Sequence, residues 1–201
     1  MSVKPLEWLP RTSPEVLSRM FKEKLAQGYE RPSHLDTFAK MACVVSERST
    51  CLWYEVGAVI FDGDANIDLS TGYNGAARGD VDPRNAGCAR VVDGKLQEGK
   101  GLCRGSHAEL NAIGNLQSST LGRNICMMVT LHPCYSCAKQ IVNKGIRKVY
   151  YLWEYGRDSH VTEYFRDRKV DIIQYSSPLL ERWAKQNRYH PVAGIRNKNG
   201  D

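Results

Sequence analysis

The sequence predicts an α/β fold in which a mixed sheet of about five strands lies between two layers of helices. Hydrophobic periodicity gives two helical segments, then a β-hairpin, then helices and strands in alternation. Alternating helices and strands favour parallel strands with helices on both faces. A chain of 201 residues is long enough for one such domain with extensions, and a second domain is not expected.

The first 33 residues are expected to form an irregular arm, residues 1–12, followed by a helix. Ser13 and Pro14 are typical of the N-cap and first position of a helix, and Gly28 is typical of the residue beyond its end. A second helix follows Ser33, which with Asp36 resembles a capping box.

A β-hairpin is predicted next, because the β-rich runs 56–61 and 67–73 flank the turn residues 62–64. Residues 76–105 then show little periodicity and many Gly, Asp and Arg residues. A loop of about 30 residues is long for a compact domain, so we expect some interaction to hold it in place.

The remaining chain alternates between helices and strands. We expect helices over 106–116, 133–143, 162–167 and 178–185, and strands over 125–131, 148–152 and 170–174. The predicted organisation is an N-terminal arm and helix (1–33), a central domain (34–176), and a C-terminal helix with a flexible tail (177–201).

The composition excludes several classes of protein. A charged fraction of 25% with 9% aromatic residues is unlike disordered, collagenous or coiled-coil chains. No apolar run approaches the about 18 residues of a membrane span, and the N-terminus lacks the apolar stretch of a secretory signal. We therefore expect a cytoplasmic protein whose seven cysteines stay reduced.

The net charge of +6 is concentrated near the C-terminus, because residues 138–201 hold 13 basic and 7 acidic residues. Such an excess suits a phosphorylated substrate or a nucleic-acid surface. The basic residues alternate with acidic ones, however, so a solvated helical face explains them equally well.

The strongest candidate site combines His107 with Cys134 and Cys137. One imidazole and two thiolates suit Zn²⁺ and leave a fourth position open to water. Each half opens a predicted helix, so two helix N-termini would stabilise the thiolates. Zinc with two thiolates acidifies its water less than zinc with three histidines, so a base is needed. Glu109 lies two residues after His107 and is placed to move the proton.

Each half of this pattern also has a purely structural interpretation. Ser106 and Glu109 fit a capping box at the start of a helix. The pair Cys134 and Cys137 fits a structural zinc site or a redox pair. The combination of both halves, each opening a helix after an extended segment, favours a catalytic zinc.

Over residues 34–175 the sequence resembles the deoxycytidylate (dCMP) deaminases of the cytidine deaminase superfamily. The zinc motif alone is shared with other zinc deaminases, including those acting on tRNA adenosine, whereas the Arg-Ser-Thr-Cys and Gly-Tyr-Asn-Gly segments are more particular to the dCMP branch. The matching segments are 46–51, 56–60, 70–75, 107–113 and 133–139.

The resemblance implies a cytidine-deaminase-like α/β/α fold for residues 34–176 and hydrolysis of dCMP to dUMP and ammonia, which supplies dUMP for thymidylate synthesis. By position, His107, Cys134 and Cys137 would hold one catalytic zinc per protomer. Glu109 would carry protons to N3 and to the leaving amine of the cytosine.

The resemblance also implies three substrate-binding residues. Arg48 and Asn74 match positions that recognise the nucleotide and its phosphate, and Tyr155 resembles a tyrosine near the phosphate. A phosphate dianion needs a guanidinium or a comparable partner. Alternatively, Asn74 and Gly75 close a turn, and Arg48 is an ordinary surface residue at the end of a helix.

Some relatives carry a second, structural zinc near the Ser-Thr-Cys segment and the long loop. Here Cys51, Cys88 and Cys103 are the candidate ligands, with no fourth ligand visible, and buried free thiols are the alternative. Cys43 and Cys126 are expected in the core.

Family resemblance further implies activation by dCTP and inhibition by dTTP in a homohexamer, with Mg²⁺ accompanying the effector nucleotide. No membrane or nucleic-acid partner is expected. The alternatives are a deaminase of nucleic acid, of the tRNA adenosine type, a deaminase of another cytosine nucleotide such as dCTP, and a zinc-stabilised binding module. The presence of Glu109 argues against the binding module.

Overall fold

The computed structural model describes residues 13–97, 103–155 and 160–191. The chain divides into two compact units, Met1–Ser33 and His34–Asp201. The arm predicted for residues 1–12 and the tail predicted for residues 194–201 lie outside the described residues. None of the described helices is long and apolar enough to cross a membrane.

The described part of the first unit centres on the helix α1 (Pro14–Ala26). Its N-cap is Ser13, whose Oγ accepts a hydrogen bond from the Val16 amide at 3.4 Å, and Gly28 beyond its end has a φ of +81°. Both predicted ends are confirmed. The apolar side chains of α1 are exposed within this unit: Leu17, Met20, Phe21 and Leu25.

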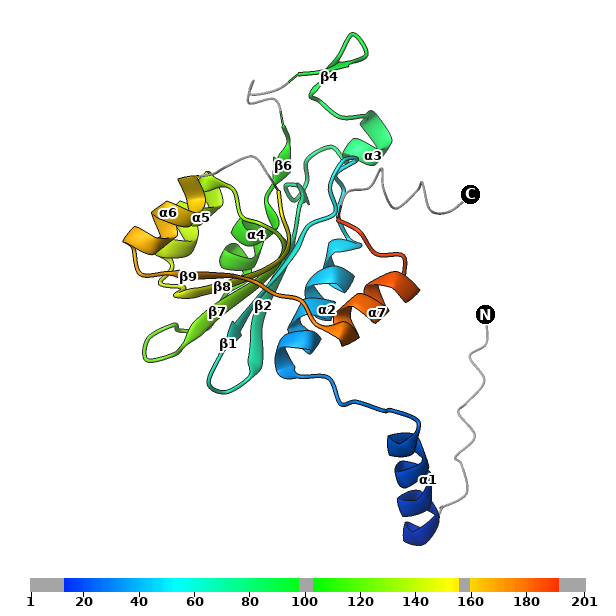
Figure 1. Ribbon diagram of the computed structural model, residues 1–201. Helices are drawn as coiled ribbons and strands as arrows, with labels where there is room; N and C mark the ends of the chain where they lie inside the picture. Colours follow the sequence, from blue (N-terminus) through cyan, green and yellow to red (C-terminus); the bar gives the residue numbers. More distant parts are fainter. Residues whose placement is uncertain (1–12, 98–102, 156–159, 192–201) are drawn as a thin grey trace. The chain divides into compact units, whose positions relative to one another are not determined.

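The second unit is built on a five-stranded mixed sheet, which confirms the predicted fold class (Figure 1). Its strands are β1 (Gly57–Asp62), β2 (Ile67–Tyr73), β7 (Ile125–Leu131), β8 (Lys148–Trp153) and β9 (Asp171–Gln174). The order across the sheet is β2-β1-β7-β8-β9. β1 is antiparallel to β2 and β7, whereas β7, β8 and β9 are parallel.

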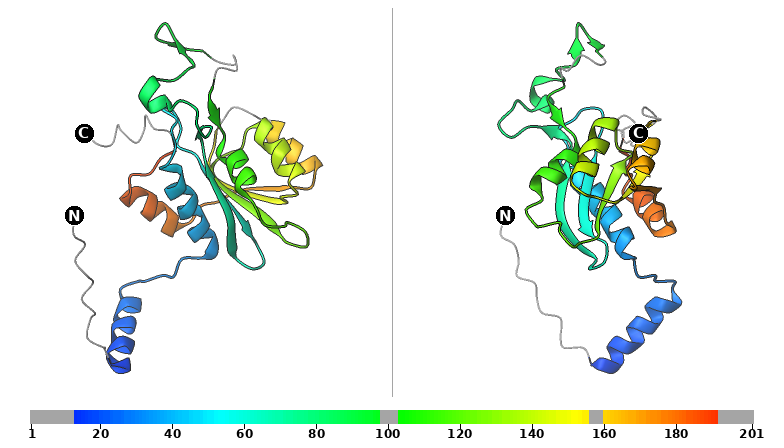
Figure 2. Two further views of the ribbon diagram at one scale, coloured as in Figure 1. Left: turned by 180° about the vertical axis from the view of Figure 1, so that it is seen from behind. Right: turned by 90° about the vertical axis from the view of Figure 1, so that its left-hand side faces the viewer.

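Helices cover both faces of this sheet (Figures 1 and 2). One face carries α4 (Ala108–Asn115), α5 (Tyr135–Asn143) and α6 (His160–Asp167), and the other carries α2 (His34–Ser46) and α7 (Pro178–Gln186). Side chains alternate between the two faces of a strand. In β7, Met127 therefore packs with the α4, α5 and α6 core, and Met128 with the α2 and α7 core.

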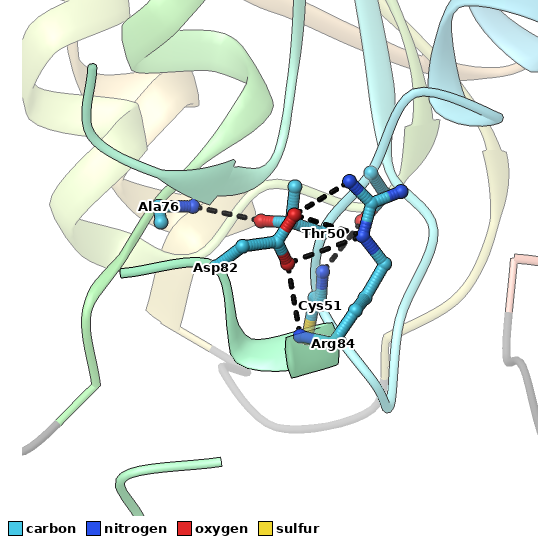
Figure 3. Close-up of polar contacts among 6 residues, drawn as sticks. Thr50, Cys51, Ala76, Asp82 and Arg84 are labelled. Carbon is cyan, nitrogen blue, oxygen red and sulfur yellow. Dashed lines mark hydrogen bonds and ion pairs between the residues drawn. The ribbon is translucent and has the colours of Figure 1, made fainter. Parts of the chain in front are cut away.

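The long segment predicted as a loop contains short elements that its lack of periodicity did not reveal. They are β3 (Gly75–Ala76), α3 (Pro83–Ala86), β4 (Val91–Val92), β5 (Lys95–Leu96) and β6 (Gly105–Ser106). β3 pairs with β6, which closes the segment directly before His107. Near its start, Thr50 Oγ1 accepts from the Ala76 amide at 2.9 Å, and Arg84 pairs with Asp82 at 2.6 Å (Figure 3).

The segment that follows α7 is hydrogen-bonded to residues at both ends of the connection between α2 and β1. Buried Tyr189 places its hydroxyl 2.8 Å from Ser46 Oγ, at the end of α2. The Glu55 amide donates to the Pro191 carbonyl at 2.8 Å, shortly before β1. Residues far apart in the sequence therefore support each other beside the sheet.

Helix α4 packs on β2 with its backbone very close to the strand. A Cβ atom added at Gly72 would lie 2.3 Å from the Ala112 amide nitrogen and 2.4 Å from the Ala108 carbonyl oxygen. Only glycine allows such an approach, and this close contact sets the position of the first part of α4 against β2.

We expect Gly72→Ala to lower the melting temperature, because the new methyl group meets helix backbone that cannot move alone. Overpacking of this kind costs about 1–3 kcal/mol of unfolding free energy. Gly114→Ala is the matched control in the same helix, since a Cβ there meets nothing within 4 Å and alanine favours helices. Thermal unfolding followed by circular dichroism measures both. Equal melting temperatures for Gly72→Ala and the unaltered chain would contradict this packing.

Candidate functional site

Three side chains from the starts of two helices meet beyond the carboxyl end of β7. His107 directly precedes α4, Cys134 directly precedes α5, and Cys137 lies in the first turn of α5. The Nδ1 atom of His107 is 3.2 Å from Cys137 Sγ and 3.4 Å from Cys134 Sγ. The structure thus brings together the three predicted metal ligands.

Neither His107 nor Cys134 caps its own helix, although both occupy N-cap positions with extended backbone. An N-cap side chain ordinarily accepts a hydrogen bond from the first turn. Here both side chains turn to the group instead, so the positive ends of two helices lie beside it. The predicted alternative of a capping box from Ser106 to Glu109 is wrong, because the N-cap is His107.

Hydrogen bonds within the group shift the pKa values of its three members in different directions. The pKa of Cys134 is lowered to about 4, chiefly by the hydrogen bond from Cys137 and further by His107. The hydrogen bond to Cys134 raises the pKa of His107 to about 8. The pKa of Cys137 is raised by its hydrogen bond to Cys134 and by burial. These shifts favour the thiolate form of Cys134, the form that binds a metal ion, and a bound cation would favour loss of the remaining protons.

The donor set fits Zn²⁺. One ligand atom from each of His107, Cys134 and Cys137 lies within 4.8 Å of the others. Zinc accepts sulfur and nitrogen ligands at about 2.0–2.3 Å and prefers four of them. Three protein ligands would leave one position for water or substrate, as in catalytic rather than structural zinc sites.

Glu109 lies beside this group without belonging to it. Its side chain is 4% exposed. Burial raises the pKa of Glu109, and the neighbouring His107 partly opposes that rise. A carboxyl group with a raised pKa holds and releases a proton nearer to neutral pH than an ordinary glutamate does.

A cavity of about 130 Å³ opens on the group. Two tyrosines, Tyr54 and Tyr155, meet edge to face in its wall, with ring centroids 5.6 Å apart. The wall thus joins aromatic surface to the metal-ligand group. Its other lining residues include Cys51, Val56, Asn74, Arg90, Cys103, His107, Glu109, Leu131, His132 and Cys134.

Asn74 holds part of this wall in place. Its Oδ1 accepts from the Val56 amide at 2.8 Å, and its Nδ2 donates to the Tyr54 carbonyl at 2.9 Å. The Asn74 amide also donates to the Val56 carbonyl at 3.0 Å. Asn74, which the sequence predicts to bind the substrate, therefore also holds the segment that carries Tyr54 in place.

The predicted substrate-binding residues are only partly brought together. Asn74 and Tyr155 line the cavity, whereas exposed Arg48, just after α2, is not among its lining residues. Arg90 lines the cavity instead. Arg90 was not predicted from the sequence, because it lies in the long segment without periodicity, two residues after Cys88.

The three cysteines predicted as ligands of a second zinc form no disulfide bonds. Cys51 and Cys103 line the cavity, and Cys88 does not. Within the described segments, the His, Cys, Asp and Glu residues form one group of potential metal ligands, and it contains none of these three. The Cys51 amide donates to Ser49 Oγ at 3.1 Å, so hydrogen bonds fix this turn.

Residues 32–153 match the family model of the cytidine and deoxycytidylate deaminase zinc-binding region. The match covers more than half of the chain. The chain belongs to this deaminase family. Membership and the His-Cys-Cys group together support the predicted Zn²⁺.

Named relatives of this deaminase-family chain agree with the match. It is 34% identical to the deoxycytidylate deaminase of Schizosaccharomyces pombe over 150 residues, 74% of this chain and 46% of that protein. It is 31% identical to the ComE operon protein 2 of Bacillus subtilis, over 86% of this chain and 87% of that protein. The chain spans about half the length of the S. pombe and Saccharomyces cerevisiae enzymes, at 46% and 49%.

Solved structures of the family share the fold. The dCMP deaminase of the cyanophage S-TIM5, crystallised with dCMP and dUMP, superposes with a TM-score of 0.58 at 26% identity. The superposition covers 73% of this chain and 100% of the phage chain.

We expect Cys134→Ala to reduce the zinc content of this deaminase-family chain, because the group would lose its most acidic thiol. Cys43→Ala is the control, since Cys43 is buried in the core on the α2 face of the sheet. Elemental analysis of both variants, with circular dichroism to confirm folding, measures the difference. Full zinc content in folded Cys134→Ala would contradict a site at this group.

Proposed function

We propose that this chain is a zinc-dependent hydrolase that converts dCMP and water to dUMP and ammonia. The observation that carries the proposal is the buried carboxyl group of Glu109 beside the group of His107, Cys134 and Cys137, at one cavity. It is supported by the named deoxycytidylate deaminases, which are 34% and 32% identical to this chain.

In this proposal His107, Cys134 and Cys137 would hold Zn²⁺, and the bound metal would supply an activated water as the nucleophile. Glu109 takes the proton of that water and delivers it to N3 of the cytosine. The remaining proton of that water then passes from the new hydroxyl group on C4 through Glu109 to the exocyclic amine. The C4–O bond forms, the C4–N bond breaks, and the amine leaves as ammonia. The raised pKa of Glu109 suits it to hold a proton between these transfers.

Asn74 and Tyr155 are proposed to recognise the nucleotide. Two of the hydrogen-bonding groups of Asn74 hold the Tyr54–Val56 segment, which leaves its second Nδ2 hydrogen for a ligand. The aromatic surface of Tyr54 and Tyr155 offers contact for the base or the sugar. Arg48 stays a prediction from the family resemblance, and Arg48→Ala tests it through the KM for dCMP.

Regulation and assembly are proposed on the same resemblance. The proposed assembly is a homohexamer, and the proposed regulation is activation by dCTP with Mg²⁺ and inhibition by dTTP. The proposed location is the cytoplasm. Light scattering coupled to size exclusion, with and without each nucleotide, measures the assembly. Rates at subsaturating dCMP in the presence of dCTP or dTTP measure the effectors.

A second, structural zinc at Cys51, Cys88 and Cys103 also stays a proposal from the family resemblance. Elemental analysis gives the zinc content of each protomer. Two zinc ions per protomer, reduced to one in Cys88→Ala, would support the second site. One zinc ion per protomer in the unaltered chain would contradict it.

The substrate is tested by a panel of dCMP, dCTP, CMP, deoxycytidine and a tRNA, with release of ammonia or change in base absorbance as the measurement. We expect the highest kcat/KM for dCMP. Turnover of dCTP alone would move the proposal to another cytosine nucleotide. Turnover of the tRNA alone would contradict it in favour of a nucleic-acid deaminase.

We expect Glu109→Gln to lower kcat for dCMP by about 10²–10⁴-fold, the usual contribution of a general acid and base. Zinc content should stay unchanged, because Glu109 is not among the grouped ligand residues. Glu47→Gln, at an exposed position after α2, is the control and should retain full activity. Activity near that of the unaltered chain in Glu109→Gln would remove Glu109 from the chemistry.

A further inference from the structure

The phosphate of a nucleotide substrate requires a cationic partner at the cavity. Among the described lining residues, Arg90 alone is an arginine or lysine. None of the basic residues near the C-terminus, where the net positive charge is concentrated, is among the described lining residues. Arg90 is therefore the candidate cationic partner.

Arg90 is held by a tight hairpin. It directly precedes β4, which pairs with β5 through the turn residues Asp93 and Gly94, both at positive φ, +51° and +71°. Positive φ at both central residues is the conformation of a two-residue turn that matches the twist of its strands. Strand pairing therefore sets the local backbone next to Arg90.

The Arg90 side chain is fixed by the same hairpin. The Gln97 amide donates to the Arg90 carbonyl at 2.8 Å, and Arg90 Nε donates back to the Gln97 carbonyl at 3.0 Å. This second bond uses the inner nitrogen of the guanidinium. The two outer nitrogens keep four N–H donors, enough for a bidentate contact with an anion.

Arg90 differs from Arg84 and Arg104, two other arginines of the long segment, in its pairing with carboxylates. Arg84 pairs with Asp82 at 2.6 Å, and Arg104 pairs with Asp80 at 3.4 Å. Among the described residues, the salt bridges include no carboxylate partner for Arg90. Arg90 is half-buried at the cavity. A partly desolvated cation without a counter-charge is stabilised by an anionic ligand.

We propose that Arg90 binds the phosphate of the nucleotide and makes the site select a nucleoside monophosphate over a nucleoside. This inference rests on the proposed function, since the phosphate in question belongs to the substrate. It assigns to the β4–β5 hairpin the role that the family resemblance gives to Arg48.

The test compares a phosphorylated and an unphosphorylated ligand. Calorimetry measures the Kd of dUMP and of deoxyuridine for the zinc-loaded unaltered chain and for Arg90→Ala, and kinetics measure KM and kcat for dCMP. We expect Arg90→Ala to weaken dUMP and raise the KM for dCMP by about 10- to 100-fold, the effect of losing charged hydrogen bonds. Deoxyuridine binding should not change. Arg90→Lys should restore part of the loss, because it keeps the charge but not the fork.

Two further variants make the outcome specific. Arg78→Ala alters an exposed arginine of the same segment outside the cavity lining, and should behave as the unaltered chain. Arg48→Ala tests the competing residue. Weaker dUMP binding in Arg48→Ala with unchanged binding in Arg90→Ala would overturn the inference. Equal weakening of dUMP and deoxyuridine in Arg90→Ala would also overturn it, because the effect would not involve the phosphate.

Failure of the proposed function is visible separately, in the unaltered chain. An unaltered, zinc-loaded chain that neither deaminates dCMP nor binds dUMP contradicts the function and the inference together. An unaltered chain that does both, with Arg90→Ala indistinguishable from it, contradicts the inference alone.

Discussion

His107 and Cys134 occupy the N-cap positions of α4 and α5, and their side chains face one group instead of their own helices. The rest of the site follows from this arrangement. The positions of the two helices set the distances between the ligand atoms, so the sheet core controls the metal site. Gly72 sets the depth of α4 against β2, and the buried strand β7 leads into Cys134. A site assembled from helix starts inherits the rigidity of the core beneath it.

The residues of the cavity wall belong to different parts of the chain from the metal-ligand group. Asn74 and the Tyr54–Val56 segment form one hydrogen-bonded unit that leads into β1. The β4–β5 hairpin and its Arg90 belong to the long segment, outside the main sheet. The metal-ligand group therefore rests on the sheet core, whereas the residues proposed to recognise the nucleotide lie on surface segments, which generally vary more among relatives.

Much of the fold is accessible from the sequence because its main elements carry strong local signals. The strand 125–131 was predicted with its observed bounds, since a continuous apolar run flanked by turns is typical of a buried strand. Strands of two residues have no periodicity, so β4 and β5 were missed, although Asp93-Gly94 is a known hairpin signal. Spacing likewise identified the group at His107, because its ligands lie near helix starts. It did not show which arginine of the long segment faces the cavity, since that depends on contacts such as the one from Arg90 to Gln97.

The anchorage of Tyr189 and Pro191 has a consequence for how this protein can be divided. The match to the family model ends at residue 153, the last residue of β8, yet the core on the α2 face of the sheet also includes Leu180 and Tyr189. The Glu55 amide, next to the cavity wall, is paired with the Pro191 carbonyl. The segment matched by the family model therefore lacks part of the core that packs on the α2 face of the sheet. A chimaera that carried only that segment into another protein would keep His107, Cys134 and Cys137 but lose the contacts that Tyr189 and Pro191 make beside the cavity wall.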